Sequence, residues 1–289
     1  MATSTGLALR STVFSPDLVL RIAKEVDGSF SSLWFPAVSA IDPFDLCARS
    51  LGATKQLKAG TGVVRLQELD LDSLAKRVVD LSRASGDRFI LGVGTGALIG
   101  PSAVIQLADL TRRFRSTHPE VFDVPIYFAA LGPRMVRSAF QEADGVLLNF
   151  CSPQYASDVI HRQSLPKDSR FRVAGYVKLF FAESDVDASR MLAEEFIHYD
   201  AVPQYHTMFQ SMGVAGIIEG FGDRSRDPEQ LVKGPISQVS LSNPGRGEVL
   251  ELLGRFREAG VDTPVVYPYV KGTDDYKLRL VQRLRDWLN

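Results

Sequence analysis

The chain has 289 residues, of which 45% are hydrophobic and 23% are charged, and its formal net charge is −1. A chain of this length can bury one large core or two small ones, and it contains no apolar run long enough for a membrane span. Lys and Arg are spread along the sequence in near balance with Asp and Glu. This balance argues against nucleic acid or a membrane surface as the main partner and favours a small-molecule ligand.

The cysteines and histidines indicate the redox environment of the protein and whether it has a metal site. Cys47 and Cys151 lack metal-ligand spacing, and the N-terminal residues lack the basic-then-apolar layout of a secretion signal, so we expect a reducing, cytoplasmic environment. The closest histidines, His198 and His206, are eight residues apart without a third ligand nearby. We therefore expect no metal site.

Strand-like and helix-like segments alternate along the chain. Ser15 before Pro16 is a good helix start, because its hydroxyl can cap free amides and proline suits the first helical position. The alternation predicts parallel strands joined by right-handed helical crossovers, in a single (β/α)₈ TIM barrel spanning residues 1–289, with an open doubly wound sheet as the alternative. The eight predicted strands are Leu7–Phe14, Ser32–Phe35, Leu57–Val64, Phe89–Gly94, Pro125–Phe128, Gly145–Asn149, Phe171–Phe181 and Pro264–Tyr267.

One region, at about residues 185–231, interrupts this alternation. It reads first as helical, then as glycine-rich and then as charged, and no strand is predicted before Pro264. We interpret it as a helical insertion before the last repeat. On a barrel such an insertion serves as a lid or pocket wall, or it adds helical packing on the outside.

Two glycine-rich stretches follow predicted strands. Gly92, Gly94 and Ala97 have the looser spacing of a dinucleotide fingerprint, but three strand-helix units precede them and no acidic residue ends the next strand. Glycines at the end of a barrel strand also let a flat ring approach the backbone, although they can simply relieve crowding. Lys58–Val64 has the same character, and a bulge or unusual peptide there could press on a ring system.

The turn at Gly132-Pro133 joins a predicted strand to a helix. The backbone amides of Gly132, Arg134 and Met135 are candidates to point outward at this helix start, where the helix dipole and the charge of Arg134 favour an anion. The turn would suit a phosphate. An ordinary strand-to-helix turn is the alternative.

In combination, these motifs resemble the bacterial luciferase-like flavin and deazaflavin oxidoreductases, and most of all the coenzyme F420-dependent methylenetetrahydromethanopterin reductases. The resemblance runs from Leu7 to Asn149 and resumes in Phe171–Phe181 and Gly247–Tyr267. The segments that carry it are Gly60-Thr-Gly-Val63, Arg88-Phe-Ile-Leu-Gly-Val-Gly-Thr-Gly96, Pro125-Ile-Tyr-Phe-Ala-Ala-Leu-Gly-Pro-Arg134 and Ala143-Asp-Gly-Val-Leu-Leu-Asn149.

The resemblance implies a TIM barrel that holds the ring of F420, or alternatively FMN, at the C-terminal ends of its strands. In the family, the peptide matching Gly62-Val63 is often cis and backs the ring. The implied dimer forms through helices near Asp42–Thr54 and Leu71–Ser85. The implied cofactor-binding residues are Gly62, Val63, Gly94, Thr95, Gly96, Ala130, Leu131, Gly132, Pro133, Arg134 and Met135.

The chain departs from the family at three polar positions. Phe35-Pro-Ala-Val38 replaces a common Asp-His pair, Ala8 replaces the glutamate of the reductases, and Ala97 replaces an acid after the fourth strand. Hydride transfer mainly requires positioning of donor and acceptor, so redox chemistry can survive these losses.

Other polar residues at strand ends are candidates to stabilise charge in the pocket. They are Arg10, Asn149 and Lys178 as catalytic candidates, together with Arg65, and a solvated or structural role is the alternative for each. Because F420 carries a phosphate and a polyglutamate tail, we also expect a basic rim, with Arg134, Arg137 and Lys178 as candidates.

The sequence thus predicts a homodimeric oxidoreductase that passes hydride between F420 and a small or pterin-like acceptor, as the methylenetetrahydromethanopterin reductases do. One alternative is an FMN-dependent luciferase-like monooxygenase. Another is a cofactor-binding homologue without catalytic activity.

Overall fold

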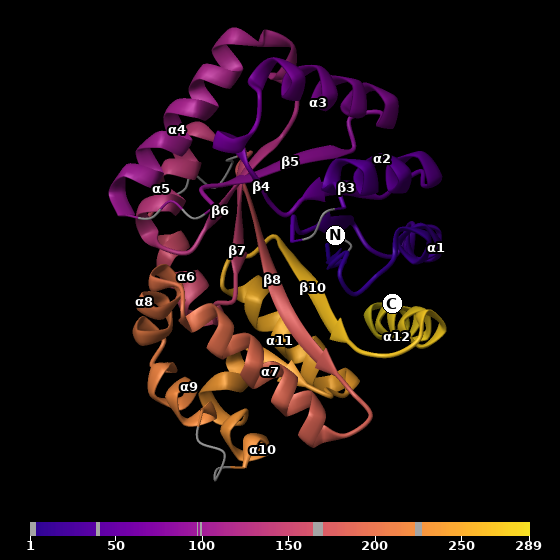
Figure 1. Cartoon of the computed structure of the whole chain (residues 1–289), viewed down its shortest axis with the longest axis vertical. Helices are drawn as coiled ribbons and strands as arrows, with labels where there is room; N and C mark the ends of the chain where they lie inside the picture. Colours follow the sequence, from indigo (N-terminus) through magenta and orange to yellow (C-terminus); the bar gives the residue numbers. More distant parts are fainter. Residues whose placement is uncertain (1–3, 39–40, 97, 99, 164–169, 223–226) are drawn as a thin grey trace.

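The structure, a computed structural model, describes residues 4–38, 41–96, 98, 100–163, 170–222 and 227–289. Eight parallel strands form a closed barrel surrounded by helices, in the order β1, β2, β3, β5, β6, β7, β8, β10 and back to β1 (Figure 1). This confirms the predicted (β/α)₈ barrel. The strands are β1 (Gly6–Ala8), β2 (Ser32–Phe35), β3 (Lys58–Thr61), β4 (Val64–Arg65), β5 (Phe89–Gly94), β6 (Ile126–Ala130), β7 (Gly145–Asn149), β8 (Arg172–Phe181), β9 (Ser240–Ser242) and β10 (Thr263–Val270).

The helices follow the strands in the expected alternation. They are α1 (Pro16–Val26), α2 (Pro43–Ala53), α3 (Leu71–Ser85), α4 (Gly100–Thr117), α5 (Pro133–Glu142), α6 (Pro153–His161), α7 (Asp185–Asp200), α8 (Pro203–Ser211), α9 (Ala215–Phe221), α10 (Pro228–Leu231), α11 (Arg246–Glu258) and α12 (Asp274–Leu288), with short 3₁₀ turns η1 (Leu66–Glu68), η2 (Pro119–Val121) and η3 (Gly234–Gln238). Within the described ranges, none of the helices is both long and apolar enough to cross a membrane.

Capping residues set the helix boundaries locally. The Ser15 hydroxyl accepts a hydrogen bond from the Leu18 amide at 3.3 Å, as the Ser-Pro sequence predicts. Ser15 also donates to Asp274 at 3.0 Å, which ties the start of α1 to the start of the last helix, α12. The two helices lie side by side and close the ring of helices (Figure 1).

Five of the eight predicted strands differ in extent from the observed ones, and the first and third differ in a way that shapes the mouth. Of the first run, Leu7–Phe14, only Leu7 and Ala8 lie in β1, because the chain turns after Arg10. The third run is interrupted: β3 ends at Thr61 and β4 begins at Val64, and both segments pair with β5. The backbone between them leaves the sheet at the C-terminal end of the barrel.

Residues 185–231 contain the predicted helical part as α7, and the described part of the segment that was interpreted as glycine-rich and then charged also forms helices, α8 to α10. Helix α7 packs against β8, and α8 to α10 lie on the same side of the barrel (Figure 1). The expectation that no strand precedes Pro264 is wrong, because Ser240–Ser242 forms β9. Of the residues of β8, strand β7 pairs with Arg172–Tyr176 alone. The edge of β8 from Lys178 to Phe180 is therefore left for β9. Three residues with one apolar side chain give no periodic signal, which explains the omission.

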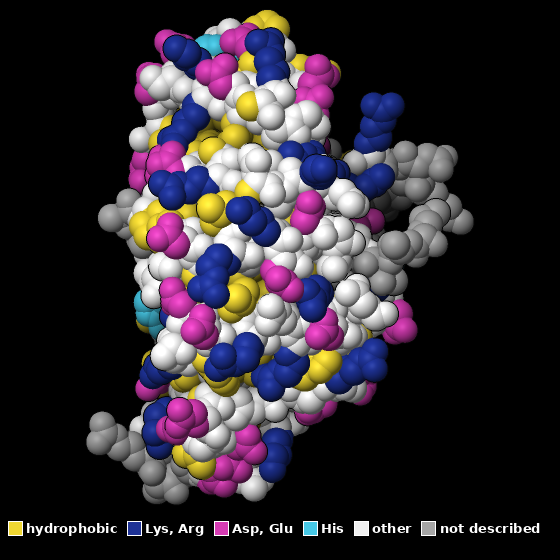
Figure 2. Space-filling view, turned by 90° about the vertical axis from the view of Figure 1, so that its right-hand side faces the viewer, with side chains coloured by type: hydrophobic (Ala, Val, Ile, Leu, Met, Phe, Trp, Pro, Cys, Tyr) yellow, Lys and Arg dark blue, Asp and Glu magenta, His cyan; other side chains and the backbone are white. Residues whose placement is uncertain are grey.

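The exposed surface mixes both signs of charge. On the face shown in Figure 2, Lys and Arg side chains are interspersed with Asp and Glu. This matches the near-neutral composition, and any local field at a site must come from the side chains and helix termini placed there.

Candidate active site at the C-terminal mouth of the barrel

The break between β3 and β4 is held by a side chain. The Thr61 hydroxyl donates to the Gly92 carbonyl at 2.8 Å and accepts from the Gly92 amide at 2.9 Å. A Cβ on Gly92 would lie 1.9 Å from the Thr61 carbonyl oxygen, so only glycine allows this approach. The next peptide, Gly62-Val63, is cis, as the family resemblance implies.

Tyr176 from β8 reaches across the barrel to this peptide. Its hydroxyl donates to the Gly62 carbonyl at 3.2 Å, and a Cβ on Gly62 would lie 1.9 Å from the same hydroxyl oxygen. Burial raises the pKa of Tyr176 well above its usual value, so the hydroxyl keeps its proton and acts as a donor. The glycine and the tyrosine fix each other's position.

The glycine loop after β5 lies against β4. A Cβ on Gly94 would approach the Val63 Cγ2 to 2.8 Å, and one on Gly96, which has φ +56°, would approach the Arg65 Cδ to 2.6 Å. Thr95 is held through its carbonyl, which accepts from the Gln67 amide group at 2.7 Å. The predicted residues Gly94, Thr95 and Gly96 therefore line the same part of the mouth as Gly62-Val63.

The dinucleotide interpretation of these glycines is wrong. The Gly92-x-Gly94 sequence lies on the fourth barrel strand, β5, and not at the first turn of an open sheet. Ala97, the third position of that pattern and one of the three family departures, lies outside the described residues.

The turn after β6 provides a helix N-terminus at the same edge. Gly132 precedes Pro133 at the start of α5, and the Tyr155 hydroxyl donates to the Leu131 carbonyl at 2.8 Å, which anchors the turn. The Met135 amide donates to the Gly132 carbonyl at 3.1 Å, so it is already used within the first turn. The Gly132 and Arg134 amides donate no hydrogen bond to a backbone carbonyl of the described residues.

The remaining predicted residues of this turn also have defined places. Ala130 is the buried last residue of β6, and the Arg134 side chain is exposed at the rim, as is Arg137 on the same helix. A side chain at Gly132 would meet no atom within 4 Å, so the space in front of the turn is open. The glycine loop, the cis peptide and this turn form one half of the mouth, which we call the glycine half: Gly62, Val63, Gly94, Thr95, Gly96 and Ala130 to Met135.

Lys178 on β8 lies in the opposite half and is fully buried. Its Nζ is 2.9 Å from the Glu195 Oε1 and lies above the rings of Phe150 and Tyr199, 3.9 and 3.8 Å from their centroids. A buried ammonium needs such a counter-charge and ring contacts to offset the loss of water. The expectation that Lys178 belongs to a basic rim is therefore wrong.

Glu195 on α7 connects the charged residues of this half. Its Oε1 also accepts from the Tyr269 hydroxyl at 2.5 Å, and its Oε2 lies 3.8 Å from the Arg10 guanidinium. Sequence reasoning missed Glu195, because it lies inside the insertion next to Glu194 and only the packing of α7 selects which of the two faces the barrel.

The pKa of Glu195 is set by opposing effects. Burial by itself would raise it, but the charge of Lys178, the hydrogen bonds from Tyr269 and Lys178, and the charge of Arg10 outweigh burial and lower the pKa below its usual value. The carboxylate is therefore ionised in the folded protein at neutral pH.

This depressed pKa predicts how stability depends on pH. The folded state binds fewer protons at Glu195 than the unfolded chain, so the contribution is complete above the unfolded pKa of about 4.3 and is lost as pH falls through the lower folded pKa. We expect Glu195→Gln to have a flatter acid limb in a plot of Tm against pH than the native protein. Parallel acid limbs for the two proteins would contradict the assignment.

Asn149 and a group of tyrosines complete this half of the mouth. The Asn149 amide donates to the Tyr205 hydroxyl at 2.6 Å, while its buried Oδ1 finds no partner among the described residues. Arg10 has a similar orphan, because its buried Nε has no acceptor in the same part of the chain. Unsatisfied buried polar atoms cost free energy in the absence of a ligand, so these two atoms mark positions where a bound molecule could supply a hydrogen bond.

The tyrosines form a continuous series from the cis peptide to the charged cluster. The Tyr176 and Tyr267 rings are 5.1 Å apart, and those of Tyr267 and Tyr269 are 4.9 Å apart. Burial raises the pKa of Tyr269 well above its usual value, so its proton stays on the hydroxyl that faces Glu195. The Tyr267-Pro-Tyr269 spacing could have been recognised in the sequence, because residues two apart on a strand share one face.

We call this second region the charged half: Arg10, Asn149, Lys178, Glu195, Tyr199, Tyr205, Tyr267 and Tyr269. Its three charged side chains, Arg10, Lys178 and Glu195, leave a formal excess of one positive charge. Within the described residues, no group of three or more His, Cys, Asp or Glu side chains could hold a metal ion. The mouth therefore combines a flat, side-chain-poor half with an aromatic and cationic half.

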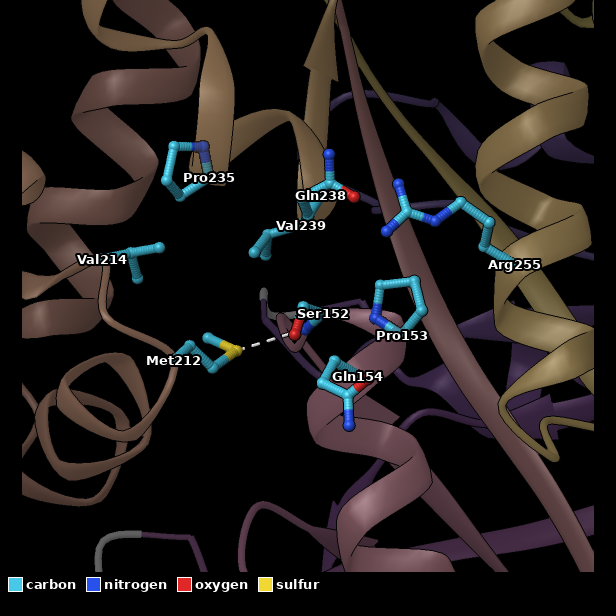
Figure 3. A pocket seen from close by; sticks show the side chains of 9 residues that line it. All are labelled: Ser152, Pro153, Gln154, Met212, Val214, Pro235, Gln238, Val239 and Arg255. Carbon is cyan, nitrogen blue, oxygen red and sulfur yellow. Dashed lines mark hydrogen bonds between the residues drawn. The ribbon is translucent and has the colours of Figure 1, made fainter.

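A separate small cavity lies outside the barrel between α6, the insertion and α11 (Figure 3). It has a volume of about 180 Å³, and the Ser152 amide contacts the Met212 sulfur across it at 3.2 Å. The Gln238 and Arg255 side chains point toward each other across one side (Figure 3). None of the predicted site residues lines it.

Comparisons with known proteins identify the family and agree with the barrel fold. A sequence model of the family described as luciferase-like monooxygenase matches residues 102–262, more than half of the chain. The chain belongs to this family. The matched segment includes Asn149, Lys178 and Glu195, so the charged half of the mouth lies largely within it. A comparison with curated protein sequences finds no match.

Solved structures of similar fold cover almost the whole chain. The coenzyme F420-dependent tetrahydromethanopterin reductase from Methanopyrus kandleri has 17% identity and a TM-score of 0.71 over 98% of both chains. An F420-dependent secondary alcohol dehydrogenase, solved with an F420-acetone adduct, has 13% identity and a TM-score of 0.73 over 100% of both. The FMN-bound oxygenating component of 3,6-diketocamphane monooxygenase from Pseudomonas putida has 18% identity and a TM-score of 0.63 over 99% of this chain and 96% of that one.

Proposed function

We propose that this protein is an F420-dependent oxidoreductase that acts on a small or pterin-like acceptor. The observation that carries the proposal is the glycine half of the mouth, where three glycine positions and a helix N-terminus create a flat surface with an anion-favouring end. The two F420-dependent neighbours have higher TM-scores than the FMN-bound one, which supports F420 over FMN.

The residues present fit such a cofactor. The Gly62-Val63 peptide and the Gly94–Gly96 loop would contact the flat ring, since side chains there would fill its space. The Gly132 and Arg134 amides and the Arg134 guanidinium would hold the phosphate. When bound, the deazaflavin supplies a hydride donor or acceptor, while the chain supplies position, charge and exclusion of water.

The charged half would then face the acceptor. Arg10, with its orphan Nε and partly exposed guanidinium, would bind an electron-rich group of the acceptor. Tyr269 holds a proton at its hydroxyl, and Glu195 keeps that hydroxyl oriented. Asn149 would contribute its orphan Oδ1 as an acceptor of a hydrogen bond.

A titration of the purified protein with F420 and, separately, with FMN tests the proposal. Saturable F420 binding with weak FMN binding, followed by turnover in an acceptor screen, is the expected result. Preference for FMN would instead favour a luciferase-like monooxygenase, for which the FMN-bound neighbour is the structural precedent. Tight F420 binding without turnover across the acceptor panel would favour a non-catalytic cofactor-binding homologue.

Arg134 provides a sharper test of the phosphate position. Arg134→Gln is expected to raise the Kd of F420 by about tenfold, because one charge-assisted hydrogen bond is lost at an exposed rim. Tm should not change, since the side chain is exposed. Arg279→Gln, at an exposed arginine on α12 that belongs to neither half of the mouth, is the matched control, and an equal effect of both substitutions would indicate general electrostatics only.

We also propose a homodimer through α2 and α3, which are the helices that the family resemblance implies. Arg77 on α3 already bridges the two helices, 2.6 Å from Asp42 and 2.8 Å from Asp45, so they form one connected surface. Light scattering during size-exclusion chromatography should give twice the chain mass of 31.8 kDa. A mass of one chain at all concentrations would exclude this dimer.

A further inference from the structure

Arg10 follows β1 at the C-terminal end of the barrel, and its backbone is fixed there. Its carbonyl oxygen accepts hydrogen bonds from the Val13 and Phe14 amides, each at 2.9 Å, which closes the turn after the strand. The side chain is 26% exposed, so a small molecule in the mouth can reach the guanidinium. The position of this cation is therefore set by the backbone that leaves the first barrel strand.

The Arg10 guanidinium has unused hydrogen-bonding capacity. Its Nε finds no acceptor among the described residues, and its closest approach to a carboxylate is 3.8 Å, from Nη1 to the Glu195 Oε2, which is too long for a hydrogen bond. The contact with Tyr269, whose ring centroid is 5.7 Å away, uses the face of a ring and takes up no N–H donor. Because a guanidinium is a donor-only group, a partly buried one without acceptors is costly until a ligand provides them.

The charges next to Arg10 do not cancel. Glu195 already lies 2.9 Å from the Lys178 Nζ and accepts a hydrogen bond from the Tyr269 hydroxyl at 2.5 Å. Its distance to Arg10 is longer, at 3.8 Å, so the carboxylate interacts more strongly with Lys178 than with Arg10. One negative charge against two positive ones leaves Arg10 as the cation without a full counter-charge.

We propose that the acceptor of this enzyme carries a carboxylate, which the Arg10 guanidinium binds with two parallel hydrogen bonds. This inference rests on the proposed function, because it takes the charged half as the acceptor site. The planar guanidinium matches the two oxygens of a carboxylate, and a single negative charge balances the single unbalanced cation. A phosphate, with a charge of about −1.5 to −2 at pH 7, would exceed that balance, and a neutral group would leave the cation uncompensated.

Calorimetric titration of the cofactor-free protein with benzoate tests this site without depending on F420. Benzoate carries one carboxylate on a ring that Tyr199 and Tyr205, which are both partly exposed, can contact. We expect saturable binding with a Kd of roughly 1 mM or tighter. Benzamide has the same ring without the charge and should bind at least about tenfold more weakly. Absence of saturable benzoate binding, or equal binding of benzamide, would overturn the proposal.

Two substitutions of Arg10 then locate the bound carboxylate. Arg10→Gln should raise the Kd of benzoate by about tenfold, and Arg10→Lys, which keeps the charge but loses the planar pair of donors, should raise it by less. Both variants break only the long contact with Glu195 and the ring contact with Tyr269, so both should fold. Arg279→Gln, at an exposed arginine on α12 outside the mouth, is the matched control. An unchanged Kd in the Arg10 variants, or an equal rise in the control, would show that benzoate binds elsewhere.

The outcome for F420 is distinguishable from the outcome for the carboxylate. If F420 does not bind while benzoate binds through Arg10, the proposed cofactor is wrong and the carboxylate site stands. If F420 binds and acceptors turn over, carboxylates in the screen should have a kcat/KM at least about tenfold above that of their matched amides, and Arg10→Gln should lower this ratio. Equal kcat/KM values for carboxylates and amides would overturn this inference and leave the proposed function intact.

Discussion

Replacing Lys178 by methionine is expected to lower the free energy of unfolding by about 3 kcal/mol, which corresponds to a fall in Tm of roughly 5 °C. The reason is that Lys178 is fully buried and lies 2.9 Å from Glu195, so its removal leaves a largely buried carboxylate with the Tyr269 hydroxyl and the more distant Arg10 as its partners among the described residues. Thermal unfolding followed by circular dichroism measures the change. Activity should fall with it, since α7 forms one wall of the mouth.

Two further variants test whether the loss of stability comes from the broken Lys178–Glu195 ion pair or from a general loss of packing. Lys178→Met combined with Glu195→Gln should be more stable than the sum of the single changes by at least about 1 kcal/mol, because Glu195→Gln removes the carboxylate that Lys178→Met leaves without its nearest counter-charge. Arg190→Met on the same helix, which breaks an exposed ion pair with Asp187, should change stability by less than about 0.5 kcal/mol. Strict additivity of the two buried changes would show that the charges are not coupled.

The second large effect is expected at Gly62. Gly62→Ala would place a methyl group 1.9 Å from the Tyr176 hydroxyl oxygen, and Tyr176 cannot move without disturbing Tyr267. We expect a loss of about 2 kcal/mol in stability from this overpacking. We also expect at least about tenfold weaker F420 binding, because the backbone that faces the ring would shift. Denaturation and cofactor titration of the same sample measure both effects.

Tyr176→Phe should rescue much of this loss. Without the hydroxyl, the nearest atom of the ring to the new methyl group is Cζ, at 3.3 Å. By itself Tyr176→Phe should cost about 1 kcal/mol for the lost hydrogen bond to Gly62. Gly254→Ala on α11, outside both halves of the mouth, is the matched control, since its Cβ would also meet no atom within 4 Å. Failure of the double variant to recover either stability or binding would mean that the steric explanation is wrong.

The sequence by itself determined the barrel and the glycine half of the mouth. Alternating strand and helix patterns are local signals, and each predicted strand exists, although only Ser32–Phe35, Phe89–Gly94 and Gly145–Asn149 have the predicted limits in the structure. The glycine half of the mouth could be predicted from the sequence for the same reason. Glycine next to a strand end has a local steric meaning, which Gly92 and Gly94 illustrate, because a side chain at either position would collide with the neighbouring strand.

Only the tertiary structure decided the charged half. Glu195 is about 17 residues from Lys178 and 74 from Tyr269 along the chain, and nothing in its local sequence distinguishes it from Glu194. Burial is likewise a property of the packed molecule. Lys178 has the sequence character of a rim cation, yet α7 covers it and converts it into the buried partner of a carboxylate, because desolvation makes the nearest counter-charge decisive.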